Sequence, residues 1–427
     1  MTQLTADQYR RQLDSVAKNP AMADDNIRLP AGSGAGIATG SLAVGALLLV
    51  ATIAGSQIYG LKHALAAFEV GVVSVTALSL GGLFWTMILH ITNSGWGVTV
   101  RRFLEHLMMM LPACVVMLGI IVLIEIGFGG VLLTWIGIDP AENYLINHKK
   151  AFLNEPFFVI RFFLYAGVWL LLASRFWRFS TEQDRSGDRF LSNQARKTAA
   201  WGLPLFALST AFFSFDFLMA MDYRFFSTMW GVYYFASATF GSVAVVLITL
   251  CVLRAMGYLT GAVTSEHTHD LGKLLFGFTV FWAYIAFSQY FLLWYSNIPE
   301  ETIWFIVRQQ GGWENVATLL VIGHFLAPFL ILLFRPVKRH SIGVALAAAW
   351  MLLMLVLDMI FIIRPMVYAG PYAAENPGPG AWWLDFVGIT GVLLVWAALY
   401  IRRLPSQPLV PLKDPKLPES LHHKNYV

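Results

Sequence analysis

Charged residues are scarce in this chain. They account for 13% of its 427 residues, whereas a soluble domain carries about 25%. The chain has two cysteines, Cys114 and Cys251, which lie in separate apolar segments. It contains no CxxC pair, no Walker phosphate-binding loop and no glycine-rich dinucleotide motif, so it lacks the usual ligand sets for iron–sulfur clusters and nucleotides. We expect both cysteines to be small buried side chains.

Hydrophobic residues are abundant, at 57% of the chain, and the mean hydropathy is +0.63. Long apolar runs recur between residues 37 and 403, which is the pattern of an integral membrane protein. No run of this length reads as a strand, and an open sheet could not satisfy its backbone in lipid. We therefore predict an all-α, polytopic membrane protein with about ten transmembrane helices. Their expected ranges are 37–58, 64–92, 104–134, 156–176, 198–221, 229–254, 271–296, 313–334, 341–363 and 381–401.

The basic residues are distributed unevenly between the connections. Most of the 29 Lys and Arg residues fall in the two tails and in the loops after the second, fourth, sixth and eighth helices, including the basic loop 175–197. The positive-inside rule then places both termini and these loops in the cytoplasm. The formal net charge of +4 reflects this asymmetry and gives no reason to propose nucleic-acid binding.

The two tails differ from the apolar middle. Residues 1–36 are polar and mixed in charge, so we expect a cytoplasmic N-terminal segment and no cleaved signal peptide. Residues 37–403 form the predicted ten-helix transmembrane domain. Residues 404–427 contain five prolines, and this predicts a cytoplasmic tail that is extended along a neighbour or disordered.

Several ionisable side chains interrupt the apolar helices, and most of them are predicted to lie in the outer half of the membrane. A carboxyl at the bilayer centre costs roughly 2.5–3.5 kcal/mol on insertion scales, so it needs a partner or a task. One interpretation is a proton relay or a polar pocket that opens outwards. The other is structural: the arginine pairs with one or two acids, and the rest cap helices or extend towards water. The residues are Glu69, Glu125, Arg161, Asp216, Asp358 and Asp385.

Histidine side chains are candidate contacts for a quinone, a haem or a metal ion. His324 lies near mid-membrane, and Pro328 four residues later leaves the His324 carbonyl without its helical partner. A kinked helix there could hold water or a quinone head group, or simply a packed histidine. His90 and His106 match in depth but lie at the inner rim, so haem and metal binding are disfavoured. The His-Thr-His run at 267–269 is expected to be solvated in an inner loop.

Two stretches resemble a known family. Residues 213–234 contain Ser-Phe-Asp-Phe-Leu-Met at 214–219, and residues 287–302 begin Phe-Ser-Gln-Tyr-Phe. Both stretches are similar to the NrfD/PsrC-like family of quinone-interacting membrane subunits. The resemblance extends over nearly all of residues 37–403. Asp216 falls on the acidic position of the family's Ser-x-Asp-Trp-x-Met-Ser-Leu run. Phe217 replaces its tryptophan, and the Met-Asp-Tyr-Arg run at 221–224 replaces the continuation that follows it.

The resemblance implies two four-helix bundles, from the second to fifth and sixth to ninth helices, with the first and tenth flanking. The most similar members are membrane subunits of alternative complex III, a bacterial quinol:cytochrome c oxidoreductase, and the ten-helix plan resembles its F subunit. The implied partners are a second NrfD-like subunit, an iron–sulfur subunit, haem c subunits, the lipid bilayer and the quinone pool, at the bacterial inner membrane. We expect no redox centre on this chain, because these cofactors belong to the partners; menaquinone or another quinone stays open as a ligand.

Three functions stay open. The chain is expected to stabilise such a complex and to conduct protons through intramembrane groups. Alternatively, it is the quinol-binding and quinol-oxidising subunit itself. A secondary transporter is favoured least, because the matched Gly/Pro interruptions of transporter repeats are not seen. The predicted proton pathway comprises Glu69, Glu125, Arg161, Asp216, His324 and Asp358, and the predicted quinone contacts are Asp216, Asp222, Arg224 and His324.

Overall fold

The computed structural model describes residues 5–368 and 382–425. Within these residues the fold is all-α, and ten helical spans are long and apolar enough to cross a membrane, as predicted. The spans are α3 (Ala35–Tyr59), α4 (Leu61–Ile91), α5 (Val98–Met108) with α6 (Leu111–Gly127), α8 (Glu155–Ser186), α9 (Phe190–Phe217), α10 (Trp230–Ala255), α11 (Ser265–Ser296), α13 (Trp313–Leu319) with η3 (Leu320–Leu326) and α14 (Ala327–Leu333), α16 (Ser341–Ile363), and α18 (Trp382–Arg403).

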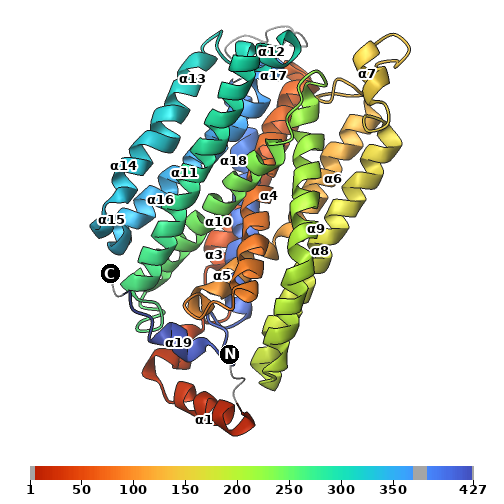
Figure 1. The fold of residues 1–427 in the computed structure, drawn as a ribbon. Coiled ribbons are helices and arrows are strands. Elements are labelled where there is room, and N and C mark those ends of the chain that lie inside the picture. Colours follow the sequence, from red (N-terminus) through yellow and green to blue (C-terminus); the bar gives the residue numbers. More distant parts are fainter. Residues whose placement is uncertain (1–4, 369–381, 426–427) are drawn as a thin grey trace.

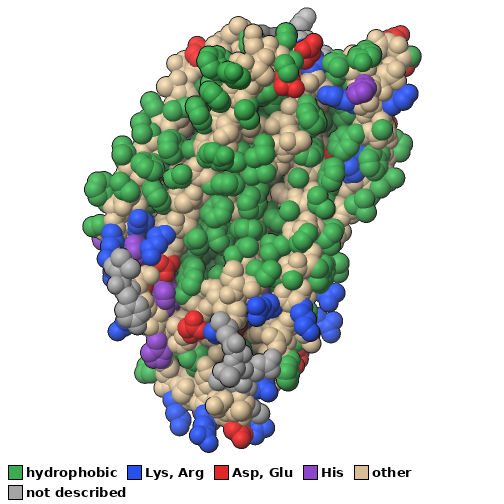
Figure 2. Space-filling model, in the orientation of Figure 1, with side chains coloured by type: hydrophobic (Ala, Val, Ile, Leu, Met, Phe, Trp, Pro, Cys, Tyr) green, Lys and Arg blue, Asp and Glu red, His purple; other side chains and the backbone are tan. Residues whose placement is uncertain are grey.

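Shorter elements connect these spans or lie in the tails. They are α1 (Ala6–Ala17), η1 (Pro20–Met22), α2 (Asp24–Ile27), α7 (Tyr144–Lys149), η2 (Met219–Met221), α12 (Pro299–Val307), α15 (Arg335–Arg339), α17 (Pro365–Tyr368), η5 (Leu404–Ser406) and α19 (Leu417–Leu421). The described residues at the two chain ends lie at the same end of the molecule (Figure 1). Lys and Arg side chains gather mainly at this end, and hydrophobic side chains cover the middle (Figure 2).

The spans form two groups that meet at α4 and α10. The first group packs α4, α5 with α6, α8 and α9 together, and the second packs α10, α11, α13 to α14, and α16. The flanking helix α3 lies along α18, which in turn lies against α4. Their close approach depends on small residues: a Cβ on Gly45 would come within 2.9 Å of the Gly391 carbonyl oxygen. Both cysteines are buried, as predicted.

Several predicted boundaries were wrong by six residues or more, and the largest departures lie in two regions. The expected helix 104–134 is two helices, α5 and α6, and it ends at Gly127. Pro112 lies in the first turn of α6, where its missing N–H is tolerated and a new helix can begin. The predicted basic loop 175–197 is mostly helical, because α8 continues to Ser186 and α9 starts at Phe190. The charged residues of α8 end its apolar run but do not end the helix. The helix stops at its C-cap, Gly187, whose φ is 68°.

The region around Pro328 departs from regular α-helix, as the sequence predicts. Residues Leu320–Leu326 form a π-helix, and Pro328 lies in the first turn of α14. The wider π turn accommodates the backbone next to a proline that cannot donate. His324 lies inside this segment and is fully buried.

The two tails pack on each other at the basic end. The Tyr9 hydroxyl donates to the Lys413 carbonyl at 2.6 Å, and the Leu409 N–H donates to the Ile27 carbonyl at 2.8 Å. Leu417 is fully buried. The proline-rich tail therefore lies along a neighbour, and that neighbour includes the chain's own N-terminal segment.

Candidate functional site

Arg161, a buried arginine of the first group, has one carboxylate partner among the described residues. Arg161 on α8 donates from Nε to Asp216 Oδ2 at 3.0 Å and from Nη2 to Oδ1 at 2.8 Å. Its Nη1 donates to the Phe152 carbonyl at 2.8 Å, and the guanidinium lies 3.8 Å from the Phe152 ring centre and 4.4 Å from that of Phe157. Asp216 is 1% exposed. This bidentate pair is neutral as a whole and well hydrogen-bonded, which favours the structural interpretation for these two residues.

Glu125 and Glu69 lie in different surroundings. Glu125 accepts backbone N–H groups of Val131 at 2.8 Å and Leu133 at 3.1 Å, and also that of Leu132. It thereby satisfies the donors of the turn that follows α6. Glu69 on α4 is 2% exposed and has no hydrogen bond or ion pair among the described residues. Its charged neighbour is Glu125, which repels its ionised form.

Asp358 is the centre of a polar cluster in the second group. It lies on α16 and is fully buried. The Tyr233 hydroxyl of α10 donates to Oδ1, and the Trp282 indole N–H of α11 donates to Oδ2 at 3.1 Å. No Lys or Arg of the described chain lies within ion-pair distance of it. Asp358 is therefore a buried carboxyl held by neutral donors.

His324 extends this cluster. Its ring stacks on Trp282 with 3.6 Å between centroids, and it meets the Phe240 ring edge to face with 5.0 Å between centroids. Both ring nitrogens are buried, and neither has a hydrogen-bond partner in the described part of the chain. A buried polar atom without a partner is rare and calls for an explanation such as a water, a ligand or a functional role.

A cavity of about 770 Å³ adjoins the cluster between α10, α11, α12 and η3. Tyr233 and Trp282 line it and also donate to Asp358. Two further lining groups, Trp230 Nε1 and Gln289 Nε2, are buried donors without a partner among the described residues. Arg308, 1% exposed, also lines the cavity. The cavity thus offers aromatic walls and several donors to a ligand with acceptor oxygens.

Arg308 and Arg364 lie outside the predicted helix ranges, yet both are buried. Arg308 donates to the Trp304 carbonyl at 2.6 Å and lies 3.3 Å from the centre of that ring. Arg364 pairs with Asp385 at 2.9 Å. Asp385 is thus paired with an arginine that the sequence did not identify as intramembrane. The sequence did not predict that these two arginines are buried, because an apolar run does not show whether an arginine that flanks it points into the protein.

The four predicted quinone contacts are not gathered at one place. Asp216 contacts α8 of the first group, whereas His324 packs against α11 of the second. Asp222 pairs with Arg224 at 2.9 Å in the connection between α9 and α10. None of the four lines the 770 Å³ cavity. Trp230 and Gln289, the two lining residues whose buried donors have no partner among the described residues, belong to the two stretches that carry the family resemblance.

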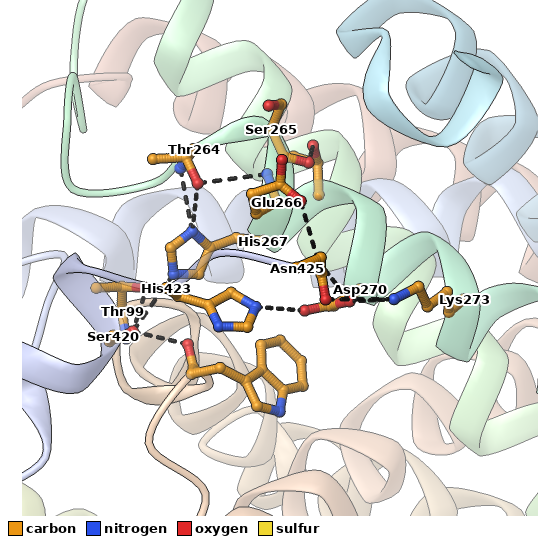
Figure 3. Close-up of polar contacts among 12 residues, drawn as sticks. Thr99, Thr264, Ser265, Glu266, His267, Asp270, Lys273, Ser420, His423 and Asn425 are labelled. Atoms are coloured by element: carbon orange, nitrogen blue, oxygen red, sulfur yellow. Dashed lines mark hydrogen bonds and ion pairs between the residues drawn. The ribbon is translucent and has the colours of Figure 1, made fainter. Parts of the chain in front are cut away.

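The histidines at the inner rim and in the 267–269 run are packed. His90 stacks on Phe176 and His106 packs against Trp177, both on α8. The prediction that the 267–269 run is solvated was wrong, since His267 is fully buried in the first turn of α11. The Thr264 N–H donates to its Nδ1 at 3.1 Å, and the C-terminal tail covers it (Figure 3). Within the described residues no three His, Cys, Asp or Glu side chains form a group suited to a metal ion.

Comparison with known proteins assigns no family: no family model matches this chain, and no curated protein matches it.

Proposed function

We propose that this chain is a NrfD/PsrC-like membrane subunit of a quinol:cytochrome c oxidoreductase of the alternative complex III type, which stabilises the complex and conducts protons through the Asp358 cluster. Supporting this, the two stretches of family resemblance meet in space: the Ser227 hydroxyl of the first donates to Gln289 Oε1 of the second at 2.9 Å. Trp230 of the first and Gln289 of the second then line the cavity beside that cluster.

Asp358 is the observation that carries the proton role. A charged carboxylate in an apolar interior is costly, so the neutral, protonated form is favoured when no cation is near. The hydrogen bonds from Tyr233 and Trp282 stabilise the ionised form and bring the two forms closer in energy. A group that is easily converted between the two forms can take up and release a proton. Asp216 does not meet this condition, because Arg161 holds its charge.

The test replaces Asp358 with asparagine in the assembled complex. Asp358→Asn retains the shape but cannot carry a proton, and its carbonyl oxygen can accept only one of the two hydrogen bonds that the carboxylate receives from Tyr233 and Trp282. We expect proton release coupled to quinol oxidation to fall at least about tenfold while the complex still assembles. The matched control is Asp139→Asn, the same change at an exposed residue outside the spans, which should leave the rate unchanged. Normal proton release by Asp358→Asn would refute the proton role.

A second candidate function is quinol binding and oxidation in the 770 Å³ cavity. Quinone oxygens are hydrogen-bond acceptors, and two residues that line this cavity carry donors, Trp230 Nε1 and Gln289 Nε2, that have no partner among the described residues. Oxidation of the quinol releases two electrons and two protons. The electrons require a redox centre on a partner chain, and the Tyr233–Asp358 hydrogen bond offers one proton a route from the cavity wall.

A photo-reactive quinone tests this second candidate. It should label the assembled complex on α10 or α11, and Trp230→Phe should reduce that labelling by about fivefold or more, since one buried hydrogen bond contributes about 1 kcal/mol. Trp294→Phe is the control, because Trp294 on α11 is 62% exposed on the outer surface of the helix. Labelling found on a partner subunit alone would contradict quinone binding here.

A further inference from the structure

A second cavity, of about 510 Å³, lies at the basic end of the molecule. The end of α4, the start of α5, the start of α9, α1 and the C-terminal tail all contribute to it. It is separate from the Asp358 cluster, and the proposed function makes no use of it. The charged side chains that line it are Arg101, Arg189, Arg196, Lys416, Asp414 and Glu419.

Both carboxylates of this cavity are already neutralised. Arg101 donates from Nη2 to Asp414 at 2.8 Å, and Lys416 lies 2.6 Å from Glu419. Arg196 is exposed and makes no ion pair with the described residues. The lining carries four basic and two acidic side chains, so its formal charge is net positive. A cavity of this charge favours an anionic ligand.

Two uncharged groups of the cavity have unmet hydrogen bonds. Ser94 Oγ and Gln12 Oε1 are buried and have no partner among the described residues. A phosphate oxygen can accept from the serine hydroxyl, but Gln12 Oε1 requires a donor. The ligand that satisfies both carries an anionic phosphate and a hydroxyl group.

An apolar surface continues from the cavity towards the middle of the molecule. Above Arg196, the same face of α9 carries Ala200 and Leu203, at helical spacings of four and seven residues, and both are accessible. Across from them on α4, Phe84 is partly exposed and stacks on Phe206 of α9. Hydrophobic side chains line the recessed strip between the two helix groups in Figure 2. A ligand with acyl chains can therefore bury them beside its head group.

We infer that this cavity binds the head group of an anionic phospholipid with a glycerol-type hydroxyl, its phosphate on Arg196 and its acyl chains along α9. The basic end, which the positive-inside rule assigns to the cytoplasm, is where such a head group is available.

The test measures lipid binding to the purified full-length chain by native mass spectrometry in detergent. Phosphatidylglycerol should bind and phosphatidylcholine should not. Arg196→Gln should weaken phosphatidylglycerol binding about fivefold, as expected for one basic residue at an anionic head group. Lys197→Gln, a neighbouring exposed residue outside the cavity lining, removes the same charge and should leave binding unchanged.

Three results would overturn the inference. Equal binding of both lipids would show that head-group charge does not matter, and equal losses in the two variants would show a diffuse effect of surface charge. Binding of inorganic phosphate alone with the same dependence on Arg196, and its displacement of the lipid at millimolar concentration, would identify a site for a soluble anion instead. A melting-temperature measurement on each variant verifies that it is folded.

Discussion

Asp216 and Asp358 are both buried carboxyls near the ends of long apolar helices, yet their surroundings give them different roles. Asp216 accepts two hydrogen bonds from the Arg161 guanidinium, and the positive charge of Arg161 neutralises the carboxylate. Asp358 accepts hydrogen bonds from the Tyr233 hydroxyl and the Trp282 indole N–H. No Lys or Arg of the described residues forms an ion pair with it. At the scale of single residues, chemistry therefore depends on the donor that each carboxyl meets. The type and depth of the acid do not determine it.

This difference predicts a larger loss of stability for one substitution than for the other. Asp216→Asn leaves the Arg161 charge buried without a counter-ion and should lower the free energy of unfolding by roughly 3–5 kcal/mol. Asp358→Asn leaves no buried charge, but its NH2 group cannot accept one of the two hydrogen bonds, so it should cost about 1–3 kcal/mol. Thermal denaturation of the purified protein in detergent measures both.

A double variant provides the control for that prediction. Arg161→Gln combined with Asp216→Asn removes both charges, so it should be more stable than Asp216→Asn alone. If the double variant is less stable than the single one, the arginine has a second anionic partner and the pair is not the closed unit described above.

At the scale of secondary-structure elements, local signals predicted some features and missed others. Pro328 correctly indicated an irregular helix, because a missing N–H acts wherever the proline lies. Apolar runs placed the ten spans, since each must match the bilayer on its own. They failed at the ends of α8 and α9, because a helix can continue into water after its apolar run stops. They also failed to separate α5 from α6.

The C-terminal tail is an element whose structure depends on its docking partner. The Ser420 hydroxyl lies 3.0 Å from that of Thr99, His423 Nε2 lies 2.6 Å from Asp270, and Asn425 donates to Glu266 at 3.1 Å (Figure 3). Composition predicted an extended or disordered segment. The structure shows an extended segment with a short helix, α19, held by side chains of α5 and α11.

At the scale of the whole molecule, the tails connect the two helix groups at the basic end. The chain ending at Leu421 loses mainly polar contacts of partly exposed residues, so we expect a change in the free energy of unfolding below about 1 kcal/mol. The chain ending at Lys416 also loses the fully buried Leu417, and this should cost at least 2 kcal/mol more, on the order of a buried leucine truncation.

Chemical or thermal denaturation of the two truncated chains in detergent checks this prediction. Equal stability of both chains would show that α19 contributes nothing to the fold. The exposed Lys424 provides a matched point variant: Lys424→Ala lies in the same tail and should leave stability unchanged.

The sequence by itself determined the fold class, the number of spans and the presence of costly polar groups within them, because hydropathy and backbone hydrogen bonding act over one helix at a time. Only the tertiary structure decided which groups work together. Tyr233 and Asp358 are separated by 125 residues, Arg161 and Asp216 by 55, and Thr99 and Ser420 by 321. Such pairings depend on how helices pack, and packing is a property of the assembled chain that no single apolar run contains.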